Sequence, residues 1–164
     1  MQTENYASII QIVAKQETLL RFDAFTAETA WDLGSFIVSR VRARGIDMAV
    51  SIRKLNGHIL FQYCTPGTSL NNQNWMNRKA NTVALTEGAS LRAWASMNVK
   101  GQTFADMGLD ALSYAFCGGG FPIRLKTGEL AGMVIVSNLP HMDDHRFLVD
   151  CLAAFLNVDN LPML

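Results

Sequence analysis

The sequence predicts an α+β domain in which helices flank a sheet built mainly from antiparallel hairpins. Two hairpin patterns carry this prediction, because in each one an alternation of apolar and polar residues stops at a glycine-containing turn and then resumes. Helical stripes of apolar residues before, between and after the hairpins provide faces that can cover the sheet. Since no repeat, low-complexity run or linker divides the chain, residues 1–164 are predicted to form a single domain.

The first hairpin is predicted to turn at Asn56-Gly57, between strands over 48–53 and 59–63. The second turns at Thr127-Gly128, between strands over 121–126 and 130–137. Both glycines suit the positive φ angles of tight turns, so each pair of strands should be antiparallel. The last strand is apolar on both faces, which predicts a central position in the sheet.

Among the helices, the one predicted to start after Thr26 has the clearest pattern. Apolar residues recur at steps of three and four from Ala27 to Val41, and Gly45 suits a left-handed end. A short helix over 4–17 and a brief strand over 19–22 precede it. A helix over 71–85 with Gly88 as a candidate cap, a short helix over 90–98 and a last helix that begins at Pro140 and stops near 160–162 follow it.

Composition restricts the class of partner. The 164 residues include 49% hydrophobic and 17% charged side chains, and the formal net charge is zero. A chain without excess positive charge is not expected to have nucleic acid as its main partner. Zero net charge also gives little electrostatic protection against self-association, so a homo-oligomer, a dimer or larger, is expected.

Cysteine usage and the apolar stretches predict a cytoplasmic protein. Cys64, Cys117 and Cys151 are too widely spaced for a CxxC motif and are odd in number, which favours free thiols in a reducing compartment. The start of the chain lacks the features of a secretory leader, and the richest apolar stretch is far shorter than the roughly 20 residues of a membrane helix. We therefore expect neither export nor insertion into a membrane.

Polar residues with a capacity for chemistry fall into three groups, and each has a plain structural explanation. Arg78, Lys79 and Asn81 on the helix that contains Trp75 could hold a carboxylate or phosphate, together with Arg53 and Arg124, or could be solvated surface. Trp75 itself is expected to pack. His141 and His145 have the spacing of two metal ligands on one helix face, but without a third ligand a partly buried histidine is the favoured interpretation.

The run Cys117-Gly118-Gly119-Gly120 precedes a strand and not a helix, so it does not match a nucleotide-binding loop. Its glycines permit close approach of a ligand or another subunit, or a flexible entry to the strand. Residue types that ligate haem iron are present, but no CxxCH motif accompanies them, and no catalytic set emerges.

Several blocks in order along the chain resemble uncharacterised protein family 0303, within the haem-degrading-domain group that includes HbpS-like and GlcG-like proteins. The matching blocks are residues 20–22, 25–30, Trp75 to Thr82, Gly119 to Arg124, Ser137 to Pro140, and Asp144-His145. The resemblance implies a profilin-like fold with a five-stranded antiparallel sheet flanked by helices on both faces, and assembly into dimers or larger rings.

The resemblance also implies a function. We expect a cytosolic protein that binds haem, a related tetrapyrrole or another small anionic ligand; the alternative is a non-enzymatic homo-oligomeric adaptor or structural protein. Whether the protein is an enzyme stays open, haem is the candidate cofactor, and a metal site is not predicted. The residues expected at the ligand site are Trp75, Arg78, Lys79, Asn81, Gly119, Gly120, Arg124 and His145.

Overall fold

The computed structural model describes residues 2–164 and confirms the α+β class. In chain order the elements are α1 (Gln2–Leu19), β1 (Arg21–Phe22), α2 (Ala27–Arg44), β2 (Ala49–Lys54), β3 (Ile59–Cys64), α3 (Leu70–Thr86), α4 (Ser90–Lys100), β4 (Gly120–Leu125), β5 (Leu130–Ser137) and α5 (His141–Leu156).

The strands form one five-stranded sheet in the order β1-β4-β5-β2-β3. Both predicted hairpins are present, with Gly57 at φ 89° and Gly128 at φ 98° in their turns, and β5 is central as expected. The neighbours β2 and β5 are antiparallel, whereas β1 pairs with β4 in parallel, so the sheet is mixed. β1 belongs to no hairpin, and therefore no tight turn forces it to run against its neighbour.

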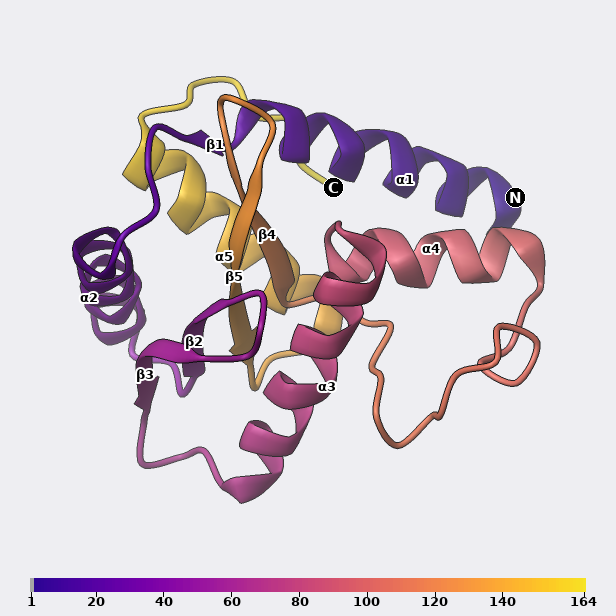
Figure 1. The fold of residues 1–164 in the computed structure, drawn as a ribbon, viewed down its shortest axis with the longest axis horizontal. Coiled ribbons are helices and arrows are strands. Elements are labelled where there is room, and N and C mark those ends of the chain that lie inside the picture. The colour runs from indigo at the N-terminus through magenta and orange to yellow at the C-terminus, as the bar shows by residue number, and fades with distance from the viewer. Residues whose placement is uncertain (1) are drawn as a thin grey trace.

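Helices cover both faces of this sheet (Figure 1). On one face, apolar side chains of β2, β4 and β5 pack with α2 and α5 into the main core. On the other face, a smaller cluster joins Met133 and Ile135 of β5 to Met76, Ala80 and Val83 of α3. α1 and α4 lie side by side at one flank of the molecule, where Tyr6 meets Trp94 edge-on at 5.1 Å between ring centroids.

The caps of α2 are as predicted, whereas the C-terminal ends of α3 and α5 differ from the prediction. Thr26 caps α2 through a reciprocal pair of hydrogen bonds with Thr29, and Gly45 ends it at φ 61°. The C-cap of α3 is Glu87, in the left-handed conformation, one residue before the expected Gly88. The C-cap of α5 is Asn157, before the predicted stop, because Asn is one of the few residues that accept the left-handed conformation readily.

Between α4 and β4 the chain runs through turns without a helix or strand, and it passes along the outside of α3 (Figure 1). This segment, residues 101–119, leads into the glycine run and so brings Cys117 towards the centre of the molecule. Across residues 2–164, no helix combines the length and the apolar character needed to cross a membrane.

Candidate functional site

A cleft of about 640 Å³ lies where the end of β5 meets the first turns of α3 and α5. Small-molecule sites in proteins typically have volumes of roughly 300 to 1,000 Å³, so the cleft can hold a ligand of cofactor size. The side chains and main chain that line it are Gly67, Ser69, Asn71, Asn72, Trp75, Lys79, Trp94, Cys117, Ser137, Asn138, Leu139, His141 and Asp144.

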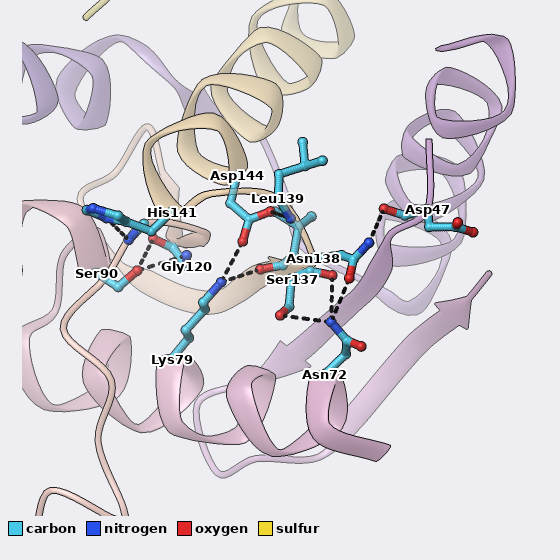
Figure 2. A network of polar contacts seen from close by, with 12 residues as sticks. Asp47, Asn72, Lys79, Ser90, Gly120, Ser137, Asn138, Leu139, His141 and Asp144 are labelled. Atoms are coloured by element: carbon cyan, nitrogen blue, oxygen red, sulfur yellow. Dashed lines mark hydrogen bonds and ion pairs between the residues drawn. The ribbon is translucent and has the colours of Figure 1, made fainter. Parts of the chain in front are cut away.

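A buried ion pair forms the inner wall of the cleft. Lys79 Nζ lies 2.8 Å from Asp144 Oδ2 and donates a second hydrogen bond to the Val136 carbonyl at 2.9 Å. The two charged side chains are only 3% and 2% exposed. Burial raises the pKa of the Asp144 carboxyl even though Lys79 acts in the opposite direction. The pair joins α3, β5 and α5 at one point (Figure 2).

The glycine run allows the backbone to pass this ion pair at close range. A side chain on Gly119 would meet the Val136 carbonyl oxygen at 2.5 Å and Lys79 Nζ at 2.6 Å, and its φ of 115° also disfavours other residues. A side chain on Gly118 would lie 2.0 Å from the His141 carbonyl oxygen. Close packing against the protein's own helices therefore accounts for these glycines, in place of a flexible entry to the strand.

A network of amides and hydroxyls forms the polar rim on the other side (Figure 2). Asn72 Nδ2 donates to Asn138 Oδ1 at 3.3 Å and to the Ser137 side chain at 3.5 Å. Asn138 Nδ2 in turn donates to the Asp47 carbonyl at 3.0 Å, which ties the end of β5 to the start of β2. These groups are uncharged and can both donate and accept hydrogen bonds.

Aromatic side chains supply the apolar surface of the cleft. Trp75 comes from α3 and Trp94 from α4, and the indole of Trp94 meets the ring of His141 edge-on with 4.8 Å between centroids. Burial lowers the pKa of His141 and raises the pKa of the Cys117 thiol, so both groups are uncharged near neutral pH. The cleft thus combines two indoles and neutral polar groups with the buried ion pair of Lys79 and Asp144.

Two predicted site residues of α3 do not line the cleft but bind main-chain carbonyls of the segment between α4 and β4. Arg78 donates to the carbonyls of Ala111 and Tyr114 at 3.0 and 3.3 Å, and its guanidinium stacks on Trp75 at 4.3 Å. Asn81 donates to the Ser113 carbonyl at 2.8 Å. Together they hold the segment that carries Cys117 against α3.

Arg53 and Arg124 do not meet, because β5 lies between their strands. Arg124 is at the hairpin end of β4, where it donates to the carbonyls of Glu87 and Gly128 at 2.8 and 2.9 Å. Arg53 is buried and contacts Ser51 and Asn77. Each cation considered for an anion site is therefore already bound to oxygen atoms of the protein.

His145 faces away from the cleft into the core. Its Nε2 lies 2.8 Å from Gln16 Oε1, and Gln16 Nε2 donates to the Pro162 carbonyl at 2.7 Å. Burial lowers the pKa of His145 to about 3. Within residues 2–164, no three His, Cys, Asp or Glu side chains gather as metal ligands, and His141 and His145 have different partners.

Of the predicted ligand residues, Trp75 and Lys79 line the cleft and Gly119 packs behind Lys79. Gly120 is buried, with its amide donating to Ser90 Oγ at 2.9 Å. Trp94, Asn72, Ser137 and Asn138 line the cleft but are absent from the predicted set. The resemblance of the block Ser137 to Pro140 to the family could have added Ser137 and Asn138 to the predicted set. No sequence signal marked Trp94, because its approach to His141 is a tertiary contact.

An open mixed sheet with helices on both faces is a fold that several solved structures share with this chain. Each of them aligns over most of its own length. Ybr137w aligns with a TM-score of 0.85 and 26% identity over 94% of both chains. HbpS aligns with a TM-score of 0.65 and 20% identity over 83% of this chain and 92% of its own. The complex of PduOC with haem aligns with a TM-score of 0.66 and 18% identity over 80% of this chain and 94% of its own.

The chain belongs to the HbpS-like family, described as haem degrading protein HbpS-like, which matches residues 25–153. Curated relatives carry the family name UPF0303, as the resemblance of the sequence blocks predicted. One from Yersinia enterocolitica is 37% identical over 88% of this chain and 86% of its own, and one from Rhizobium etli is 38% identical over 90% and 89%.

Proposed function

We propose that the cleft binds a flat ring ligand of the tetrapyrrole class, with haem as the first ligand to test, in a cytoplasmic protein. The observation that carries the proposal is a cleft of about 640 Å³ lined by two indoles, in a chain of the HbpS-like family. Indole faces stack on flat conjugated rings, and amide and hydroxyl groups at the rim can orient a ring by hydrogen bonds. A similar fold has also been solved as a complex of PduOC with haem.

A small anion receives less support than a ring. Lys79 is neutralised by Asp144, and Arg78 and Arg124 are bound to main-chain carbonyls. An anion in the cleft would have to compete with Asp144 for Lys79, which lines it. A ring ligand needs no cation, because two indoles and neutral hydrogen-bonding groups line the same cleft.

Titration of the purified protein with hemin tests the proposal. We expect a saturable shift of the Soret band at one hemin per chain. Replacing Trp75 by Leu should weaken binding by about 3- to 10-fold, the equivalent of roughly 0.5 to 1.5 kcal/mol for one aromatic stacking contact. Trp31→Leu is the matched control, because Trp31 lies on α2 against Phe61 and not in the cleft. Equal, unsaturable binding by all three proteins contradicts the proposal.

Whether bound haem is also degraded is a separate measurement. If it is, a reductant should bleach the bound chromophore faster than it bleaches free hemin under the same conditions. Bleaching at the rate of free hemin would leave the protein as a binder without turnover.

The second candidate, a homo-oligomeric adaptor or structural protein, draws on two leucines that stand almost fully in solvent. Leu70 is 83% exposed and Leu112 is 82% exposed, so a second copy of the chain that covered them would bury apolar surface. Light scattering of the protein and of Leu70→Ser/Leu112→Ser tests this candidate. A monomeric parent protein, or an assembly unchanged by both substitutions, contradicts a role for these leucines.

A further inference from the structure

We infer that His141 contacts the ring ligand as a neutral hydrogen-bond donor through Nε2–H and does not bind iron, so that the cleft holds a porphyrin with or without its metal. This inference rests on the proposed function, and it assigns to His141 the role of binding the ligand by a hydrogen bond.

The hydrogen bond to the glycine run determines which nitrogen of His141 carries the proton. The Gly118 amide donates to His141 Nδ1 at 3.3 Å. A main-chain N–H can only donate, so Nδ1 presents its lone pair, and in a neutral imidazole the proton is then on Nε2. Nε2 accepts or donates no hydrogen bond among the described residues and is not among their buried unpartnered atoms, so it is free to meet a ligand.

The helix dipole, burial and a nearby positive charge keep the His141 ring neutral. His141 is the first residue of α5, where the positive end of the helix dipole disfavours an imidazolium. Burial, and then the charge of Lys79 from α3, lower its pKa, against which Asp143 acts in the raising direction. Trp94 of α4 faces the same ring and carries no charge. Near neutral pH the group at the cleft is therefore imidazole.

An imidazole in this state is a poor ligand for iron. A metal binds the unprotonated nitrogen, which here is Nδ1 and is already engaged by Gly118. Coordination through Nε2 would require the proton to move to Nδ1, where it would face the Gly118 N–H. Cys117, the neighbouring thiol in the cleft, is no substitute, because burial raises its pKa and metals bind the thiolate.

The glycine run makes this arrangement possible. Because a side chain on Gly118 would lie 2.0 Å from the His141 carbonyl oxygen and 3.0 Å from His145 Cβ, only glycine lets its amide come so close to the start of α5. The edge-on contact with Trp94 also restrains the orientation of the His141 ring. His141 thus has a defined orientation before any ligand arrives, which reduces the entropy lost on binding.

The first test compares two probes, hemin and metal-free protoporphyrin IX, on the parent protein. We expect their dissociation constants to agree within about threefold, since no bond to iron contributes. His141→Phe should weaken both by about 3- to 10-fold, the usual effect of one lost hydrogen bond between neutral groups. His141→Gln should recover most of the affinity, because its amide can place an N–H close to the position of Nε2.

His58→Phe is the control, since His58 lies in the exposed turn between β2 and β3. The inference is overturned if hemin binds much more tightly than protoporphyrin IX and both His141 variants lose affinity for hemin alone. That result, with a low-spin spectrum lost in both variants, would identify His141 as an iron ligand while leaving the proposed function intact.

The second test needs no ligand. In ¹⁵N-labelled protein without porphyrin, we expect the Nδ1 of His141 to resonate in the unprotonated range and Nε2 in the protonated range near neutral pH. The opposite assignment overturns the inference. If neither porphyrin binds, the proposed function and the ligand contact are both wrong, and the nitrogen shifts still decide the tautomer.

Discussion

Asp144 and His145 are consecutive residues of α5, yet they lie in two differently organised polar regions. Asp144 faces the cleft and forms a charged pair with Lys79 of α3, and it also accepts a hydrogen bond from the Leu139 amide at 2.9 Å. His145 faces the core and forms a neutral pair with Gln16 of α1. Both pairs are buried, and both connect α5 to another helix.

The difference between the two regions is a difference of charge state, and it follows from the partners. A buried carboxylate requires a cation and several donors, and Lys79 and the amide of Leu139 supply them. A buried imidazole without a carboxylate beside it stays neutral, which is why Gln16 suffices for His145. The first region should therefore respond most to loss of a partner, and the second to acid.

The largest expected effect is at Lys79. Replacing it by Met leaves the Asp144 carboxylate buried without a cation, so we expect the free energy of unfolding to fall by about 3 to 5 kcal/mol. Denaturant titration at neutral pH measures this. In Lys79→Met/Asp144→Asn the charge is gone and an oxygen remains for the Leu139 amide, so more than half of the loss should be recovered.

Lys126→Met is the matched control for charge removal. Lys126 also pairs with an aspartate, Asp23, at 2.8 Å, but the two side chains are 66% and 86% exposed. Its removal should change the free energy of unfolding by less than about 0.5 kcal/mol. If Lys79→Met is as mild as Lys126→Met, the ion pair does not stabilise the junction of α3, β5 and α5.

The second effect concerns acid and His145. Since burial lowers its pKa to about 3 from the ordinary 6.5, the unfolded chain takes up a proton there before the folded protein does. The contribution of His145 to the free energy of unfolding is therefore complete above pH 6.5. It declines as pH falls towards 3, by about 1.4 kcal/mol per pH unit.

His145→Gln removes this titration and keeps an amide donor for Gln16. The difference in unfolding free energy between the parent protein and the variant should hence shrink as pH falls below 6.5. His58→Gln serves as the comparison, because it makes the same substitution at an exposed histidine in the turn between β2 and β3. A constant difference between parent and His145→Gln from pH 7 to pH 4 would show that His145 takes up its proton equally in the folded and unfolded protein, and so contradicts the prediction.

The smallest effect is local and concerns the outer wall of the cleft. Arg78→Met and Asn81→Ala each remove donors to main-chain carbonyls of residues 111–114, at a cost of about 1 kcal/mol each. We expect faster amide hydrogen exchange in residues 101–117, and a global free energy of unfolding lowered by no more than about 1 kcal/mol.

Arg124→Met tests whether this loosening is local. Arg124 likewise donates to two carbonyls, but at the far end of β4. Its replacement should leave exchange in residues 101–117 unchanged. Equal exchange in the Arg78, Asn81 and Arg124 variants would mean that the α3 side chains do not hold the segment.

Elements with a local signal were predicted well. The Asn56-Gly57 and Thr127-Gly128 turns, the cap at Thr26 and the central position of β5 all depend on residues near one another in the chain. The parallel pairing of β1 and the end of α3 at Glu87 were missed, because position in the sheet and tolerance of a left-handed residue depend on surroundings that the local pattern does not contain.

The lining of the candidate cleft was predicted less completely, as adjacent residues of α3 illustrate. Arg78 and Lys79 look equivalent in the sequence, but a step of 100° around the helix sends one to the outer segment and the other into the core. His145 was chosen and faces Gln16, whereas His141, considered only as a metal ligand, lines the cleft.

The sequence by itself determined the α+β class, the two hairpins, the caps of α2 and membership of the family, because turn chemistry, side-chain periodicity and residue blocks are properties of short stretches of chain. Only the tertiary structure decided which polar side chains share the cleft and which charges are neutralised. Lys79 and Asp144 are 65 positions apart, and their pairing exists only once α3 and α5 are packed at the end of β5.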